Sequence, residues 1–493
     1  MMRAQKNALW IGVCMIALAA PVARAQQSQQ SKQQTPQQPA DQSSGPIPAY
    51  RSPLASAADN GDNDDESQEL APDTHALSGA QNLSLGISTA RSYWQPHFDF
   101  SEVADSNAQE TANSAGWGTW TSLSGGVDVH QTSRSNDLSM SYTSGGMLAH
   151  NLGVASGVVQ ELHFTDKFTF HRSSLSLFDE LNYLPESALG FGGLAVPALP
   201  GGISPGLGSS FTPGQSLLLT GFGQNLGNAF ATELDTFLTP RTSLTFVGGY
   251  SLLHFFDSDL LDFSGFNFRG GYNYQMTRKD SIAVLYTFNG IRYSNFNQFI
   301  NEHTVQVSYG RRVTGRLAFQ VAAGPQVATS RIPISGNAVS GAGTGTGTNF
   351  TEVYWSLSTA LGWRAERTSL GLTYDHGATG GSGVLAGAIT DVVTGGASRQ
   401  VSRTFSNSIF GGYARNEGVA LSSSQPLSHT YDYLFAGAGF SHPFGRATAL
   451  KFSYEMQYQT SNSALCIGTT CGTNVIRHMI TMGVSWNERP LLF

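Results

Sequence analysis

The residues of this sequence that could carry chemistry are few and scattered. Asp375 and His376 are adjacent, and a carboxylate beside an imidazole is a pairing that hydrolytic sites use for acid–base catalysis. No second acidic pair stands at a spacing that would complete such a site, and His-Glu-x-x-His and phosphate-loop patterns are absent. We therefore interpret the pair as the entrance to a loop. We expect no enzymatic activity, no catalytic residue, no cofactor and no metal.

Two cysteines near the C-terminus suggest a disulfide. Cys466 and Cys471 flank a four-residue segment, and only His478 lies close enough in sequence to add a metal ligand. A metal site needs more ligands than that, whereas an oxidising compartment favours a disulfide that closes a small loop. The sequence predicts the disulfide.

The N-terminal region predicts export. Residues 1–25 combine Arg3 and Lys6 with an apolar run from Ala8 to Ala20, and end in Ala23-Arg24-Ala25, the pattern of a cleaved signal peptide. Residues 26–80 are rich in Gln, Pro and Ser, with too little apolar surface to fold. We predict a disordered periplasmic leader there. The modest net charge of −7 argues against a nucleic-acid partner.

From residue 93 onward the sequence alternates with period two. Ile282, Val284, Tyr286 and Phe288 share one face of a predicted strand, and Ala283, Leu285 and Thr287 share the other. Similar segments of ~10 to 15 residues recur to the C-terminus, with Ser, Thr, Asn, Gln and Gly on the polar face. Such segments are longer than the strands of soluble β-proteins, which average ~5 to 6 residues. The pattern predicts an all-β fold, a membrane-spanning antiparallel β-barrel over residues 93–493.

The connections between these segments alternate between tight and long. Eight tight turns are expected near Ser133–Asn136, His171–Ser173, Thr239–Thr242, Thr277–Asp280, Val313–Arg316, Glu366–Thr368, Phe405–Asn407 and Pro443–Arg446. The longest connections are expected at Pro185–Asn228, Ile332–Phe350, Gly377–Ile389, Glu417–Ser428 and Ser461–Asn474. Outer-membrane barrels have short periplasmic turns and long outer loops. Adding a first strand around Trp94–Phe100 and a last strand at Val475–Asn487 predicts about 18 strands, or sixteen if one hairpin is misread, with both termini periplasmic.

Charged residues within the strands should point into the barrel. An Arg or Lys facing lipid at mid-bilayer costs ~2 to 4 kcal/mol. The strand phase therefore predicts eight lumen-lining residues: Glu233, Asp235, Arg269, Arg364, Asp375, Lys451, Glu455 and Arg477. Their mixed signs predict a transverse field with little net ion preference. A plugged lumen, and a Pro185–Asn228 loop folded inward or capping the outside, stay open as alternatives.

The C-terminal strand carries a family resemblance. Thr481-x-Gly483-x-x-Trp486 resembles the terminal strand signal that the outer-membrane barrel-assembly machinery reads, although Glu488 and Pro490 depart from it. Asn182-Tyr183-Leu184-Pro185-Glu186-Ser187, with the Gln/Pro-rich leader, resembles uncharacterised porin-like barrels of Acidobacteria-type bacteria. The resemblance implies a bacterial outer-membrane barrel and carries no substrate and no catalytic residues.

The sequence leaves three functions in competition. The first is a porin-like passive channel for small hydrophilic solutes, in contact with membrane lipid. The second is an outer-membrane hydrolase with its site at the rim, where omptin-type proteases place Asp and His residues. The third is a structural or adhesive surface barrel whose loops contact partners. The channel is the preferred hypothesis because barrels of 16 to 18 strands leave an aqueous passage. The oligomeric state is left open.

Overall fold

The computed structural model describes most of the chain from residue 92 onward. The described residues are 92–107, 116–150, 156–184, 224–256, 262–293, 298–332, 348–382, 385–402, 405–418, 430–445, 447–461 and 474–492. None of these residues is helical, so no helix among them could cross a membrane. Four predicted features lie outside this part of the chain: the signal peptide, the leader, the Cys466–Cys471 disulfide and most of the Pro185–Asn228 connection.

Eighteen long strands and one short strand account for the regular structure of the described residues. They are β1 (Tyr93–Asp105), β2 (Gly118–Thr132), β3 (Asn136–Ala149), β4 (Gly157–Thr169), β5 (Ser173–Leu184), β6 (Asn225–Thr239), β7 (Thr242–Phe255), β8 (Phe263–Gln275), β9 (Asp280–Tyr293), β10 (Gln298–Thr314), β11 (Leu317–Ile332), β12 (Thr348–Arg364), β13 (Thr368–Ser382), β14 (Leu385–Ser402), β15 (Phe405–Gly418), β16 (Thr430–Pro443), β17 (Thr448–Ser461), β18 (Asn474–Asn487) and β19 (Leu491–Leu492). The shortest of the first eighteen has 12 residues. At ~3.3 Å per residue, such a strand crosses an apolar band ~25 Å tall even when it is tilted.

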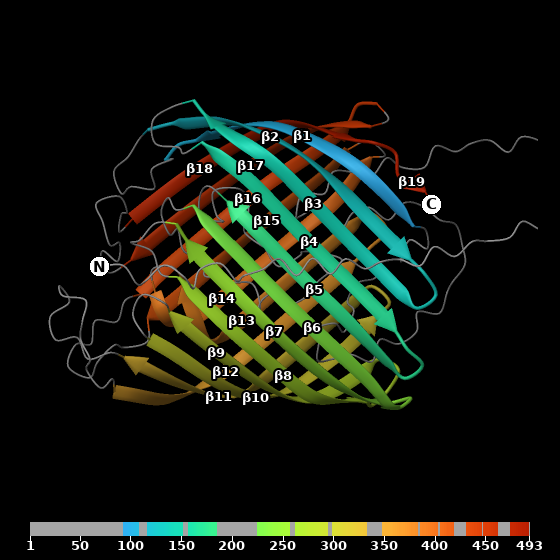
Figure 1. Ribbon diagram of the computed structural model, residues 1–493, viewed down its shortest axis with the longest axis vertical. Helices are drawn as coiled ribbons and strands as arrows, with labels where there is room; N and C mark the ends of the chain where they lie inside the picture. The colour runs from blue at the N-terminus through green and yellow to red at the C-terminus, as the bar shows by residue number, and fades with distance from the viewer. Residues whose placement is uncertain are drawn as a thin grey trace, which may run out of the picture. The chain divides into compact units, whose positions relative to one another are not determined.

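The strands form one closed antiparallel sheet. Each of the eighteen pairs with its successor along the chain, and β1 pairs with β18 from His97↔Asn487 to Asp105↔Met479. Figure 1 shows the strands running obliquely around the barrel, with β1 and β18 side by side. The two residues of β19 pair with Tyr93 and Trp94 and extend the closure at one end. Closure leaves neither β1 nor β18 with an unpaired edge along this register.

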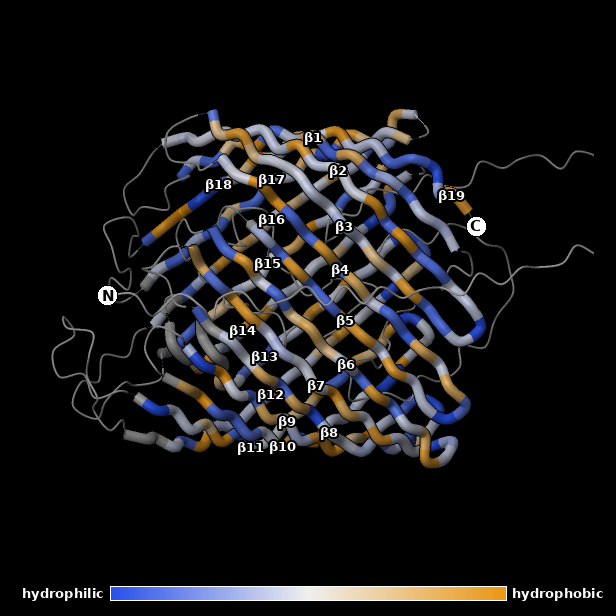
Figure 2. The backbone as a smooth tube through the Cα atoms, viewed as in Figure 1, coloured by the Kyte–Doolittle hydropathy of each residue, from blue (hydrophilic) through white to orange (hydrophobic). Residues whose placement is uncertain are grey.

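Alternate residues of each strand expose large apolar side chains. Trp94, Phe98 and Phe100 of β1 are 43%, 43% and 45% exposed. Phe100 lies opposite Leu123 of β2, and Phe98 lies opposite Trp486 of β18, so the same face continues from strand to strand. Figure 2 shows the result as hydrophobic and hydrophilic residues alternating along the strands. An exposed, continuous apolar belt on a closed sheet is the surface that lipid covers.

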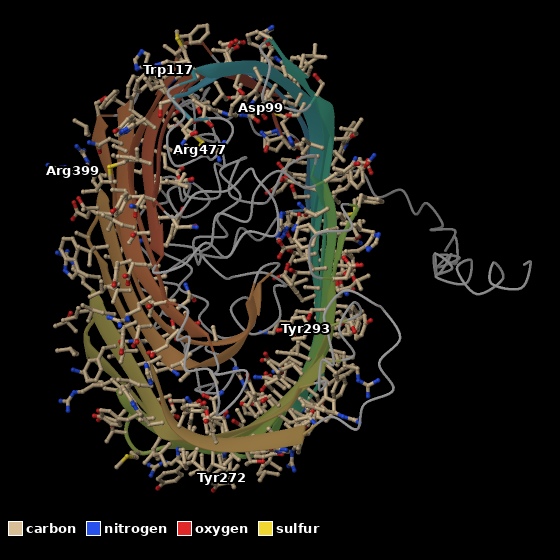
Figure 3. The ribbon with its side chains drawn as sticks, turned by 90° about the vertical axis from the view of Figure 1, so that its left-hand side faces the viewer. Asp99, Trp117, Tyr272, Tyr293, Arg399 and Arg477 are labelled. Atoms are coloured by element: carbon tan, nitrogen blue, oxygen red, sulfur yellow. The ribbon has the colours of Figure 1, made fainter. Side chains whose placement is uncertain are left out.

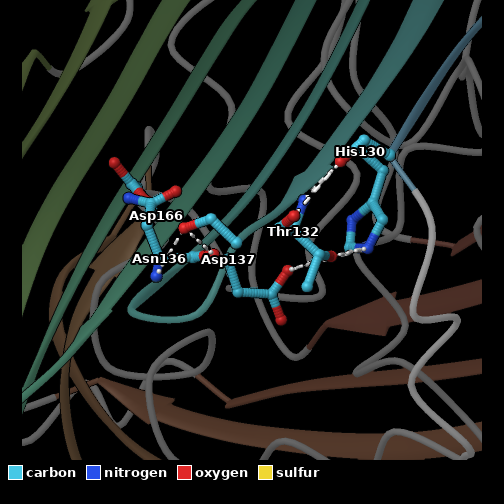
Figure 4. A network of polar contacts seen from close by, with 7 residues as sticks. His130, Thr132, Asn136, Asp137 and Asp166 are labelled. Atoms are coloured by element: carbon cyan, nitrogen blue, oxygen red, sulfur yellow. Dashed lines mark hydrogen bonds and ion pairs between the residues drawn. The ribbon is translucent and has the colours of Figure 1, made fainter. Parts of the chain in front are cut away.

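Tight connections of two to four residues join the strands at one end of the barrel, called here the tight-turn end. In the β2–β3 turn, the backbone N–H of Ser133 donates to the carbonyl of Asn136 at 2.7 Å. A polar network surrounds this turn (Figure 4): Thr132 Oγ1 lies 2.8 Å from the Nε2 of His130, and Asn136 Nδ2 donates to Asp166 at 2.6 Å. In the β16–β17 turn, Gly445 has a φ of 111°, which favours glycine.

The structure confirms the predicted all-β barrel with eighteen long strands and excludes the count of sixteen. Two of the predicted connections are misplaced. Gly377–Ile389 is not a long loop, because β13 continues to Ser382 and β14 begins at Leu385, with Gly381 opposite Ala386. Phe405–Asn407 is the start of β15, and β14 ends before it at Ser402, which lies opposite Phe405. The small residues of β13 and β14 pair in the ladder, so the Gly-rich composition of 377–389 misled the prediction of a loop there.

Substitutions of neighbouring residues that lie on opposite faces of a strand should differ in their effect on stability. Val305 is 46% exposed at the middle of β10, on the apolar face, and Gln306 beside it donates to Ser356 on the other face. We expect Val305→Arg to lower the free energy of unfolding by about 2–4 kcal/mol, because the charge must enter the lipid. Gln306→Arg should cost less than about 1 kcal/mol, since it replaces one hydrogen bond at a polar wall. Urea unfolding of both variants in lipid vesicles measures the difference, and equal losses would show that the faces are wrongly assigned.

Candidate functional site: the inner wall

The face opposite the apolar belt is called here the inner wall. It consists of the side chains of β1–β18 that alternate with the exposed apolar ones, and it is rich in Ser, Thr, Asn and Gln. Figure 3 looks along the barrel and shows Asp99, Tyr293 and Arg477 within the ring of strands, whereas Tyr272 and Arg399 point away from it. Apolar clusters also occur on the inner wall, such as Leu253, Phe255, Tyr293 and Ile300. The wall is thus mainly polar, with apolar patches at several heights.

Two predicted residues pair with carboxylates of β1 where the barrel closes. Arg477 Nε donates to Asp105 Oδ2 at 2.5 Å, and neither side chain has any exposed surface. Lys451 Nζ donates to Asp99 Oδ1 at 2.5 Å, with side chains 15% and 23% exposed. The sequence prediction missed both aspartates. The phase of Trp94, Phe98 and Phe100, already assigned to the outside, would have placed Asp99 and Asp105 on the inner wall.

Glu233, Asp235 and Arg269 lie together on the inner wall of β6 and β8. Val247 of β7 lies between them: it is opposite Glu233 in the β6–β7 pairing and opposite Arg269 in the β7–β8 pairing. Asp235 accepts a hydrogen bond from Thr245 Oγ1, and Arg269 Nε donates to Thr287 Oγ1 at 3.3 Å. Both carboxylates are buried, at 6% and 4% exposure. Opposite charges therefore share this part of the wall.

The remaining predicted residues also fall on the inner face by register. Asp375 lies opposite Ser358, and Arg364 ends β12 at the tight-turn end. Glu455 accepts a hydrogen bond from Gln457 Nε2 at 2.7 Å. All eight predicted residues thus sit on the face that alternates with the apolar belt.

Asp375 and His376 do not form a joint site. Adjacent residues of a strand point to opposite faces, so Asp375 is on the inner wall and His376 is on the outer face. There His376 Nδ1 lies 2.7 Å from Asp391 Oδ1, and its ring stacks on Trp355 with 3.8 Å between the ring centroids. The residues opposite it in the flanking strands are Leu357 and Asp391. The Asp375-His376 pair therefore cannot act on one substrate.

Glu302 is a buried acid of the inner wall that the sequence prediction overlooked. Its carboxylate accepts hydrogen bonds from Asn289 Nδ2 at 3.1 Å and from Gln326 Nε2 at 3.4 Å, and its side chain is 1% exposed. Asn267 donates in turn to Asn289, which extends the network over four strands, β8 to β11. Glu302 Oε1 has no hydrogen-bond partner. Neutral amides, not a cation, hold this carboxylate in place.

Positive charge is unevenly distributed between the two ends of the barrel. Every connection at the tight-turn end carries an arginine: Arg134, Arg172, Arg241, Arg278, Arg316, Arg367, Arg403 and Arg446. The connections at the opposite end, from 106–117 between β1 and β2 to 462–473 between β17 and β18, contain no Lys or Arg at all. This asymmetry is a property of the sequence and the strand order together.

No group of three or more His, Cys, Asp or Glu side chains suited to a metal occurs among the described residues.

The closed sheet, its apolar outer belt and its polar inner wall define the chain as a transmembrane antiparallel β-barrel. Several solved outer-membrane proteins are similar to it in structure. Pseudomonas aeruginosa OpdQ has a TM-score of 0.41 at 12% identity, covering 82% of this chain and 100% of its own. Acinetobacter baumannii OccAB3 has a TM-score of 0.40 at 10% identity, covering 80% and 99%. Pseudomonas aeruginosa OpdK with vanillate has a TM-score of 0.39 at 8% identity, covering 81% and 99%.

No family model and no curated protein matches the sequence. The resemblance to porin-like barrels of Acidobacteria-type bacteria stays a prediction from the sequence. None of the similar structures assigns a role to a residue of this chain.

The buried Asp105–Arg477 pair should matter more for stability than an exposed one. Asp105→Asn leaves the Arg477 guanidinium buried without its counter-charge, which costs about 3–5 kcal/mol. Asp137→Asn serves as the control, because Asp137 is 46% exposed and lies 3.6 Å from His130, a contact worth at most about 1 kcal/mol. Urea unfolding in lipid vesicles measures both variants. Equal losses would mean that the pair does not secure the closure.

Proposed function

We propose that the chain is a porin-like passive channel for small hydrophilic solutes in the bacterial outer membrane. The observation that carries the proposal is the predominantly polar inner wall of a closed barrel of eighteen long strands. Closed barrels of this size are wide enough to leave an aqueous passage, whereas eight-stranded barrels are filled by their own side chains. A wall of Ser, Thr, Asn and Gln would line such a passage with groups that solvate hydrophilic solutes.

The proposal includes an orientation and an assembly route. Tight turns face the periplasm in outer-membrane barrels, so the tight-turn end and both termini are placed there. Residues 1–25 would serve as the signal peptide and 26–80 as the periplasmic leader. Thr481, Gly483 and Trp486 lie in β18, the strand that closes the barrel on β1, and they fit the signal that the assembly machinery reads. Membrane lipid and passing solutes are the other partners.

A pair of neighbouring cysteine variants tests whether the inner wall faces water in an open passage. Ser358 and Leu357 are adjacent in β12, on the inner wall and the outer face respectively. In a Cys466→Ser/Cys471→Ser background, we expect a charged methanethiosulfonate reagent to lower the single-channel conductance of Ser358→Cys in planar bilayers. Leu357→Cys should be unaffected, because its thiol faces lipid.

The parent protein should show discrete conductance steps in the same bilayers. Folded protein that inserts and never conducts would contradict the channel and favour a plugged barrel. Peptide or lipid hydrolysis by that protein would favour the hydrolase hypothesis. If the protein attaches to surfaces, and deletion of residues 332–350 abolishes attachment while conductance persists, the result would support an adhesive function in addition to the channel.

A further inference from the structure

The inner wall carries more acidic than basic side chains. The eight residues predicted from the sequence are balanced, with four acids and four bases. Register across all eighteen strands adds eight acids and two bases among the described residues. The acids are Asp99, Asp105, Asp128, Asp137, Glu161, Glu180, Glu233, Asp235, Glu302, Glu352, Asp375 and Glu455, and the bases are Lys167, Arg269, Arg312, Arg364, Lys451 and Arg477. The excess is six negative charges, twelve acids less six bases.

The excess is concentrated in the half of the wall that lies away from the tight turns. Glu161, Glu180, Glu302 and Glu352 occupy that half of β4, β5, β10 and β12. None of them has a Lys or Arg opposite it in a flanking strand: their register partners include Asn182, His163, Asn289 and Ala328. Of the bases, Lys167, Arg312, Arg364 and Lys451 lie towards the tight-turn end. Arg477 lies in the acidic half but is paired with Asp105.

Glu302 and Glu352 are neighbours within this acidic half. Both lie opposite Ala328 of β11, one on each side, so only a small side chain separates the two positions. Glu302 is held by Asn289 and Gln326, and its Oε1 is buried without a hydrogen-bond partner. A carboxylate oxygen left open between neutral donors is the group that an ammonium or a metal cation can bind.

The connections at this end do not offset the acids. They contain no Lys or Arg, and they add Glu110, Glu186, Asp257, Asp259 and Asp262. Fields in a water-filled passage extend over a Debye length, about 8 Å at physiological ionic strength, so charges act without touching the solute. Rings of carboxylates make channels cation-selective.

We infer that the channel selects cations and small solutes bearing an ammonium group over anions, and that Glu302 and Glu352 contribute to this selectivity. The inference rests on the proposed channel function. It also replaces the expectation of little net ion preference, which came from the eight balanced residues alone.

The reversal potential of the full chain in planar bilayers under a KCl gradient tests the inference. We expect a potassium-to-chloride permeability ratio of about 3 or more, which corresponds to a wall potential on the order of one kT. We take the logarithm of this ratio to be proportional to the excess charge. Glu302→Gln/Glu352→Gln should then lower the logarithm by about a third, so that the permeability ratio falls from about 3 to about 2. Both substitutions keep the side-chain shape, and Gln at position 302 can still accept from Asn289 and Gln326 through its carbonyl oxygen.

A matched double variant controls for the change in total charge. Glu102 and Glu417 lie on the outer face of β1 and β15, so Glu102→Gln/Glu417→Gln removes the same two charges without touching the wall. Its permeability ratio should equal that of the parent. Electrophoretic heat modifiability verifies that each variant is folded.

The outcomes separate the two proposals. Absence of conductance from folded, inserted protein contradicts the channel itself. Conductance with a ratio at or below one leaves the channel intact and overturns the cation preference. The role of these two glutamates is overturned if the preference for potassium is unchanged in Glu302→Gln/Glu352→Gln. It is also overturned if the preference falls equally in the outer-face control.

Discussion

The backbone hydrogen bonding between the first and last strands is the constraint on which the rest of the structure depends. In lipid, an unpaired N–H or C=O group costs several kcal/mol, so a spanning sheet has to close on itself. The pairing of β1 with β18 meets that requirement over nine residue pairs, from His97↔Asn487 to Asp105↔Met479. Closure then fixes which face of every strand looks outward, since each register transmits the phase of one strand to the next.

The same pairing concentrates polar side chains where the chain ends meet. Asp105 and Arg477 are fully buried on the two closing strands, and Lys451 reaches Asp99 from β17 across β18. An ion pair of this kind stabilises little in itself, because burial removes both charges from water. It penalises other registers instead, since slipping β1 by one residue would move Asp105 to the lipid face and separate it from Arg477.

Much of the barrel could be predicted from the sequence because lipid forces a strict alternation. Val305 and Val307 had to share one face, and tight turns such as Thr239–Thr242 carry polar and Pro signals that mark strand ends. The failures have local causes. Gly377–Ile389 alternates between small residues, which give no hydropathy signal although they pair well. Asp375 and His376 are adjacent in sequence but separated by the sheet itself.

The charge of the wall was harder to predict than its position, and the reason is physical. An inward acid such as Glu302 leaves no trace in hydropathy beyond its phase, and its partners Asn289 and Gln326 come from two other strands. Only the side-chain hydrogen bonds of the folded structure show that amides surround it. Where β1 closes on β18, acids meet bases and the pairs serve the fold. Along β4, β5, β10 and β12 the acids lack that compensation, so their field is left to act on whatever passes the wall.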